Sequence, residues 1–180
     1  MPNWCYNKLQ VGGAEPEVKE LRTMMSEGFS LEKITPTPKK LFLKDGEANR
    51  PLTFSEGMKK TGGGLPDWYS WRLENWGTKW DVLHLSTNTQ KKVLFNDETE
   101  VEFQTAWSPP IVALKTLSEK LKKLIFKLEY IDEQMNFKGK ATIKGGYVHD
   151  VCRDVDLDME FGEKLDSNTH DPKELRSNDK

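Results

Sequence analysis

Two amphipathic helix patterns, each flanked by segments that alternate apolar and polar residues, constrain the fold of this chain more than any other feature. The first predicted helix begins at Glu15-Pro16-Glu17 and ends at Gly28, since proline is favoured in a first turn and glycine at a helix end. The second follows Ser108-Pro109-Pro110 and runs to about Lys123. Each carries an apolar stripe at three- and four-residue spacing that can pack on a sheet: Val18, Leu21, Met24 and Met25, then Leu114, Leu117, Leu121 and Leu124.

Alternating segments predict strands around both helices. We expect strands at 4–11, 29–34, 80–88, 92–95, 101–107, 125–131, 136–144 and 147–161. Between them, residues 35–66 contain four Pro and five Gly and are interpreted as an inserted loop. A short helix from Trp68 to Trp76 follows, with Asp67 as its N-cap and Gly77 at its end.

This order predicts an α+β fold. Removing the insertion at 35–79 leaves a split β-α-β core, in which two helices cover one face of an antiparallel sheet, with an antiparallel extension at the C-terminal side. We expect one domain over residues 1–163. Residues 164–180 contain only Leu165 and Leu175 as sizeable apolar groups and are predicted to be a disordered tail.

Composition excludes several classes of protein. No run approaches the roughly 18 apolar residues of a membrane span, and the start lacks the pattern of a secretion signal, so we expect a cytosolic protein. Cys5 and Cys152 are too few and too far apart for a disulfide framework, a zinc site or an iron–sulfur cluster, and no cofactor is predicted. Residues 1–148 contain 22 Lys/Arg and 19 Asp/Glu, and 149–180 contain 5 and 10, which is not the basic footprint of a duplex-DNA binder.

Three segments resemble a known family: Met1 to Asn7 with Leu9, Val11 and Gly13; Trp68 to Arg72 running on to Trp76-Gly77-Thr78-Lys79-Trp80-Asp81; and Thr105 to Pro110. Together they are similar to the YubB-type ferredoxin-like domain family of phages, prophages and conjugative plasmids. The resemblance covers roughly residues 1–143. It implies a ferredoxin-like topology, a mobile-element origin and a setting in the host cytoplasm. It implies no catalytic residue.

The candidate site is the aromatic helix and the segment after it. Hydrogen-bonding groups among indoles suggest a recognition pocket in which a flat base stacks on Trp and Arg planes while Asn75 and Lys79 contact its edge or phosphate. The candidate ligand-binding residues are Trp68, Trp71, Arg72, Asn75, Trp76 and Lys79. The alternative is that this helix only docks on the sheet, with Arg72 paired to a strand acid such as Asp81, Glu102 or Glu129.

Other constellations are weaker. Trp4 and Tyr6 share one face of the first strand. RNA-recognition domains of this topology stack RNA bases on aromatic side chains of the open sheet face. Asp154, Asp156 and Asp158 line one strand face. They could bind a hard cation such as Ca²⁺, or they are solvated acids on an edge strand that discourage edge-to-edge pairing. Cys5 with His84 or His149 is the one thiol–imidazole combination, and Gly62-Gly63-Gly64 lacks the lysine of a phosphate loop.

These observations favour a non-catalytic binding protein of a phage or plasmid that engages a host or defence-system protein. Its predicted contact surfaces are the loop at 35–66 and residues 150–161 of the sheet. The second hypothesis is capture of a nucleotide or single-stranded RNA by the aromatic helix. The third is an enzyme that acts on nucleotides.

Overall fold

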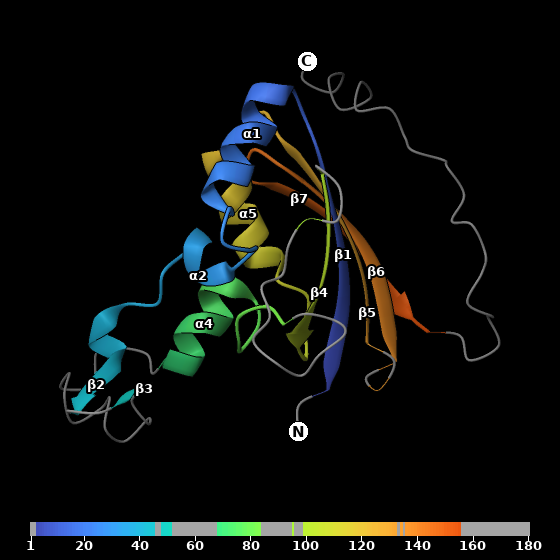
Figure 1. The fold of residues 1–180 in the computed structure, drawn as a ribbon. Coiled ribbons are helices and arrows are strands. Elements are labelled where there is room, and N and C mark those ends of the chain that lie inside the picture. The colour runs from blue at the N-terminus through green and yellow to red at the C-terminus, as the bar shows by residue number, and fades with distance from the viewer. Residues whose placement is uncertain are drawn as a thin grey trace, which may run out of the picture.

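A five-stranded antiparallel sheet with its helices on one face forms the body of the protein (Figure 1). The computed structural model describes residues 3–45, 48–51, 68–83, 95, 99–132, 134 and 136–155. The sheet has the order β4-β1-β5-β6-β7, and a separate hairpin pairs β2 with β3. The strands are β1 Trp4–Gly12, β2 Phe42–Asp45, β3 Ala48–Pro51, β4 Glu100–Ala106, β5 Ile125–Asp132, β6 Phe137–Lys144 and β7 Tyr147–Asp154. The helices are α1 Glu15–Met24, α2 Leu31–Ile34, α4 Trp68–Trp76 and α5 Ile111–Lys120, with a 3-10 turn at Lys39–Leu41.

The central strand β1 sets the two faces of the sheet. It pairs antiparallel with β4 on one side and with β5 on the other. Its buried and more exposed residues alternate along the strand, as the sequence pattern predicts. Cys5 and Leu9 therefore point to the helices, whereas Tyr6 and Gln10 point to the opposite face.

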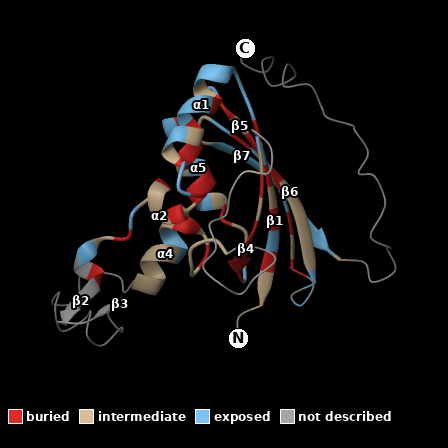
Figure 2. Cartoon of the chain, viewed as in Figure 1, coloured by how far each residue is buried: buried red, intermediate tan, exposed pale blue. Residues whose placement is uncertain are grey.

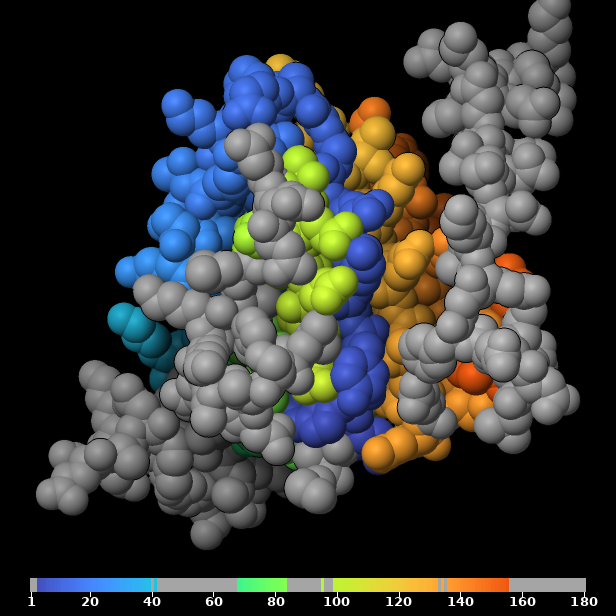
Figure 3. Space-filling view, turned by 45° about the vertical axis from the view of Figure 1, so that its right-hand side comes forward, coloured from blue at the N-terminus to red at the C-terminus, as the bar shows by residue number. Residues whose placement is uncertain are grey.

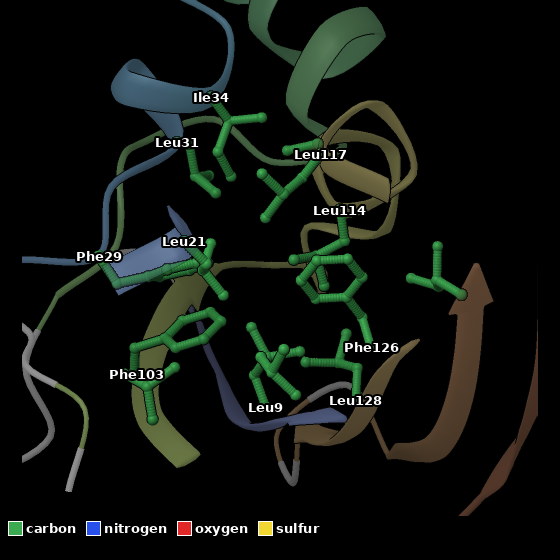
Figure 4. Close-up of a cluster of buried hydrophobic side chains, with 14 of the residues drawn as sticks. Leu9, Leu21, Phe29, Leu31, Ile34, Phe103, Leu114, Leu117, Phe126 and Leu128 are labelled. Atoms are coloured by element: carbon green, nitrogen blue, oxygen red, sulfur yellow. The ribbon is translucent and has the colours of Figure 1, made fainter. Parts of the chain in front are cut away.

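The core lies between this sheet and the helices (Figure 4). Phe103 and Phe126 from the sheet meet Leu21 of α1 and Leu117 of α5, and all four are buried. The ring of Phe29 packs on that of Phe103 with centroids 5.0 Å apart. Burying a side chain of this size contributes about 1.5–3 kcal/mol. The stripes predicted for the two helices are therefore the faces that hold the layers together.

The strand order is that of a split β-α-β unit with an extension. Helix α5 joins β4 to β5, and β1 lies between these two strands. Beyond β4, Leu83 forms an isolated antiparallel bridge with Gln104. Strands β6 and β7 extend the other side of the sheet. The predicted α+β class, its antiparallel sheet and its single helical face are thus confirmed.

The prediction of a strand at 29–34 is wrong, because residues Leu31–Ile34 form helix α2. The Asp81 carboxylate accepts hydrogen bonds from the Leu31 backbone N–H and the Ser30 hydroxyl, each at 2.6 Å. A carboxylate at this position satisfies free N–H groups at a helix start. Leu31 and Ile34, three residues apart, are then both buried. A residue 50 positions away along the chain therefore sets the local structure.

Other boundaries also differ from the predictions. The loop at 35–66 contains the 3-10 turn and the β2–β3 hairpin, and α5 begins at Ile111, directly after the predicted prolines, and ends at Lys120. At 80–88 the described part forms only the bridge at Leu83. Residues 52–67, 84–94 and 156–180 lie outside the described residues, and with them lie Asp67, the Gly62-Gly63-Gly64 run, most of the strand predicted at 92–95 and the predicted tail. The domain limit at residue 163 stays a prediction.

The contact between Asp81 and α2 gives a first test. We expect Asp81→Ala to lower the free energy of unfolding by about 1–2 kcal/mol, because the N–H of Leu31 loses its acceptor. Asp81→Asn keeps one oxygen acceptor and should recover part of this loss. Urea unfolding followed by circular dichroism measures both. The control is Glu74→Ala on the exposed face of α4, and an equal loss in that variant would contradict the capping role.

Candidate functional site

The predicted site residues divide into an inner and an outer group around α4. This helix packs on α5. It ends at Gly77, whose φ of 81° is one that glycine adopts without strain. A Cβ at Gly77 would lie 3.3 Å from Val112 of α5, so a larger residue would also crowd this contact. The chain then continues through Thr78, Lys79 and Trp80 toward the end of β4.

The inner group fixes α4 against the rest of the protein. The Trp76 indole is buried, and its Nε1–H donates to the Thr35 carbonyl at 2.8 Å. The Trp71 ring meets that of Trp76 edge to face, with centroids 6.2 Å apart. The Asn75 amide donates to the Trp71 carbonyl within the same helix, at 2.8 Å. These three predicted site residues therefore make internal contacts, as the docking alternative expects.

Arg72 belongs to the inner group as well. Its guanidinium lies 4.4 Å from the centroid of the Trp76 ring and 5.4 Å from that of Trp68. Its Nε–H donates to the Thr37 hydroxyl at 3.2 Å, and its charge pairs with Glu32 at 3.7 Å. Burial lowers the pKa of Arg72, and the nearby Glu32 and Asp81 act in the opposite direction. Of the acids that the docking alternative names, only Asp81 acts on the charge of Arg72, and the ion pair itself is made with Glu32 on α2, which that alternative did not name.

The outer group is an aromatic cluster around the Lys79 ammonium. We define the aromatic cluster as Lys79 with the rings of Trp4, Trp68, Tyr69, Trp80 and Trp107. The Lys79 Nζ lies 4.9 Å from the centroids of both Trp80 and Trp107, 5.3 Å from Tyr69 and 5.9 Å from Trp68. Each contact lies within the roughly 6 Å range of cation–π attraction. Four rings thus hold one positive charge at the surface.

The rings of the aromatic cluster also contact one another. Trp80 and Trp107 are stacked, with centroids 6.5 Å apart and an interplanar angle of 26°. The Trp80 ring also contacts Trp4, with centroids 6.0 Å apart. Tyr69 meets Trp107 edge to face, with centroids 6.5 Å apart. Trp107 keeps 37% of its surface exposed, and the other rings are half-buried. The cluster is therefore packed within itself and open to a ligand at Trp107.

The backbone at Trp107 is held in an unusual conformation. Its φ is 66°, in the left-handed region that is costly for a bulky residue. The Trp107 N–H donates to the Asn3 carbonyl at 3.0 Å, which anchors the residue to the start of β1. Strain of this kind costs about 1–3 kcal/mol and tends to occur at functional sites. The strained residue is also the most exposed ring of the aromatic cluster.

A buried polar network positions the cluster from below. We define the buried polar network as Asn7, Gly77, Thr78, Thr105 and Ser108. The Asn7 amide donates to the Thr105 hydroxyl at 2.9 Å, and that hydroxyl donates to the Ser108 carbonyl at 2.7 Å. The Ser108 hydroxyl donates to the Gly77 carbonyl, and the Thr78 hydroxyl to the Ala106 carbonyl. The network thus joins three segments that are far apart in the sequence.

Sequence reasoning identified only part of the outer group. It named Lys79 and Trp68, but placed them with the inner group in one pocket. It did not name Tyr69 and Trp80 among the ligand-binding residues, although both lie within the segment that it interpreted as the pocket. Trp4 and Trp107 were not placed with this segment, since Trp4 lies on β1 and Trp107 directly follows β4. The available signal was that Trp4, Trp80 and Trp107 each lie in one of the three segments that carry the family resemblance.

The other sequence candidates lie apart from this site. Cys5 is buried, and this burial raises the pKa of its thiol to about 12, with Asp132 acting in the same direction. His149 lies on β7, separated from β1 by two strands. Asp154 ends β7, and Asp156, Asp158 and His84 lie outside the described residues. Within the described ranges, no three metal-ligating side chains gather in one place.

None of the helices in the described part of the chain combines the length and the apolar composition needed to cross a membrane.

The buried polar network gives a second test. Thr105→Val keeps the side-chain shape but removes both hydrogen bonds of the hydroxyl, which leaves the buried Asn7 amide with one acceptor fewer. We expect the free energy of unfolding to fall by about 1–3 kcal/mol. The intrinsic tryptophan emission should shift in the folded protein, because the network supports Trp107. Thr142→Val on the exposed face of β6 is the control, and similar effects in both variants would contradict the role of the network.

Comparisons with known proteins agree with this architecture. A family model described as the ferredoxin-like domain in Api92-like protein matches residues 79–171, which is more than half of the chain. The crystal structure of protein api92 from Yersinia pseudotuberculosis aligns over 81% of this chain and 95% of that chain, with a TM-score of 0.50 and 8% sequence identity. At this identity the likeness extends to the fold alone. No curated protein matches the chain. On the extent of the family match, the chain belongs to the family of ferredoxin-like domains in Api92-like proteins.

Proposed function

We propose that this chain is a binding protein that holds a nucleotide, or the unpaired bases of a single-stranded nucleic acid, on its aromatic cluster. One observation carries the proposal: Trp107, strained at a φ of 66° and 37% exposed, lies beside the Lys79 ammonium. A planar base stacks on the exposed indole, and a phosphate pairs with the ammonium. Both groups are thus available at one surface position.

The energetics favour a ligand with more than one base. Stacking of one base on an aromatic side chain contributes about 1–3 kcal/mol. A dissociation constant of about 1 mM already corresponds to about 4 kcal/mol, so one stacked base gives weak affinity. A second ring or a phosphate contact is needed for micromolar affinity. The cluster offers further rings at Trp80 and Trp4 and the charge of Lys79.

We further propose that the protein comes from a phage or plasmid and acts in the host cytoplasm. This part of the proposal rests on the resemblance to the YubB-type family in the three segments named above. In that setting, a protein that sequesters a nucleotide or an RNA would act on the host without catalysing a reaction.

Removal of the exposed ring tests the aromatic cluster directly. We expect Trp107→Ala to weaken the binding of adenosine monophosphate about tenfold, which is about 1.4 kcal/mol and within the range for one stacked base. Chemical-shift titration by NMR measures this at millimolar ligand.

The matched control is Leu73→Ala, because Leu73 is also 37% exposed and lies on the outer surface of α4. Its affinity should equal that of the unchanged protein. A flat response of the unchanged protein to all four ribonucleoside monophosphates would refute nucleotide binding by this cluster.

A second candidate function, engagement of a host or defence-system protein, is favoured by β7. Among the described strands β7 pairs only with β6, and all eight of its residues are exposed (Figure 2). Its exposed apolar side chains include Tyr147, Val148 and Val151. An edge strand with unpaired backbone groups is suited to pairing with a strand of another protein. The strand also contains part of the surface predicted at 150–161.

A charge on this edge tests the second candidate. Affinity purification from host cells should recover one protein in a stoichiometric amount, and Val151→Lys should abolish its recovery because a lysine opposes strand pairing at a sheet edge. Thr142→Lys places the same charge on the neighbouring strand and should retain the partner. Equal recovery with both variants would contradict docking at β7.

A further inference from the structure

The face of the sheet that points away from the helices continues the surface of the aromatic cluster. Trp4 and Tyr6 are two residues apart on β1 and share this face. The Trp4 ring contacts Trp80 of the cluster, and Tyr6 is 43% exposed. Figure 3 shows the described parts of β4, β1, β5 and β6 side by side on this surface. An extended ligand that begins at Trp107 can therefore continue over Trp4 to Tyr6, which lie about 7 Å apart along β1.

The strand register places cations beyond Tyr6. Tyr6 pairs with Ile131, Ile131 with Lys138, and Lys138 with Arg153, so the four residues form one row across β1, β5, β6 and β7. Neighbouring strands lie about 4.8 Å apart, which puts Arg153 about 14 Å from Tyr6. A ring therefore stands at one end of this row, and two positive charges stand at the other.

The charges on this face are unequally distributed. Its described acids are Glu100, Glu102 and Glu129, and each is paired: Lys8 contacts the first two at 2.9 and 3.6 Å, and Lys140 contacts Glu129 at 2.7 Å. Four further cations of this face form no ion pair with a described residue: Lys127, Lys138, Lys144 and Arg153. Among the described residues, the positive charge that has no ion-pair partner thus lies on β5, β6 and β7, away from the aromatic cluster.

We propose that an unpaired RNA strand of several nucleotides lies across this face, with bases on Trp107, Trp4 and Tyr6 and phosphates at Lys138 and Arg153. The inference rests on the proposed function and extends its site from one nucleotide to a strand. Stacking requires unpaired bases, which excludes a duplex. The cations that form no ion pair with a described residue provide what a polyanion needs and a single nucleotide does not use.

A second row of polar side chains on this face, about 13 Å along β6 from Lys138, can favour RNA over DNA for a strand that extends there. Thr142 pairs with Lys127 on one side and with His149 on the other, and all three side chains are exposed on the same face. The hydroxyl of Thr142 and the imidazole of His149 can each donate or accept a hydrogen bond. A ribose 2′-hydroxyl also donates and accepts, and it is the group by which proteins tell RNA from DNA.

Fluorescence anisotropy with labelled oligoadenylates tests the inference on the full-length protein. The probes are a dinucleotide, a tetranucleotide and an octanucleotide of RNA, and the octanucleotide of DNA. We expect affinity to rise with RNA length, and the RNA octanucleotide to bind at least about fivefold more tightly than its DNA counterpart. Equal affinity for all lengths, or no preference for RNA, would overturn the proposal.

The double variant Lys138→Gln/Arg153→Gln separates this inference from the proposed function. The double variant should bind the RNA octanucleotide about tenfold more weakly, and the slope of log Kd against log salt should fall by about 1.4. Its affinity for adenosine monophosphate should stay unchanged. Trp107→Ala should lower the affinity for both the octanucleotide and adenosine monophosphate. The control Lys19→Gln/Lys122→Gln removes two exposed charges from the helical side and should change neither.

The outcomes are distinct. In one outcome, mononucleotide binding depends on Trp107 but octanucleotide binding is unaffected by the Lys138/Arg153 change. This result overturns the proposed RNA path and leaves the proposed function in place. Loss of octanucleotide affinity in both double variants assigns the effect to overall charge and also overturns the path. Absence of binding by every nucleotide ligand overturns both proposals.

Discussion

The hydrogen bond from the Asn7 amide to the Thr105 hydroxyl joins the central strand to the strand beside it inside a buried layer. A buried amide that loses a hydrogen-bond partner costs about 1–3 kcal/mol, so this contact adds to the backbone pairing that already joins β1 to β4. The same hydroxyl continues to Ser108, and Ser108 reaches Gly77 at the end of α4. The position of the short helix, and of the segment that follows it, therefore depends on a polar network rather than on apolar packing alone.

This network has a consequence at the surface. It holds the start of β1, the end of β4 and the segment after α4 together, and each of these supplies one indole to the aromatic cluster: Trp4, Trp107 and Trp80. The inner residues of α4 are used differently, since Trp76 and Arg72 bind α2 and the turn after it. The inner residues of α4 thus hold the helix in place, whereas its outer residues belong to the aromatic cluster, which adjoins the open face of the sheet.

Local patterns were sufficient for most of the fold. Alternation predicted β1, β5 and β6, because each strand has one buried face and its period of two is visible without a partner. The stripes of α1 and α5 were equally clear. The segment at 29–34 was misassigned because its apolar spacing fits either a short strand or one helical turn, and the carboxylate of Asp81 decides between them. The site was predicted in part, since Lys79 and Trp68 lie in a recognisable aromatic segment, whereas Trp107 joins them only through strand pairing.

The sequence by itself determined the α+β class, the order of the main strands and helices, and the two faces of the central strand, because these follow from periodicity and capping within short segments. Tertiary structure alone decided which groups meet: that Arg72 pairs with Glu32, and that four rings surround Lys79. It also decided that the described acids of the open sheet face have ion-pair partners, while several cations there have none within the part of the chain that the structure describes. These contacts join residues tens of positions apart, and their distances depend on strand register and helix docking, which no local pattern encodes.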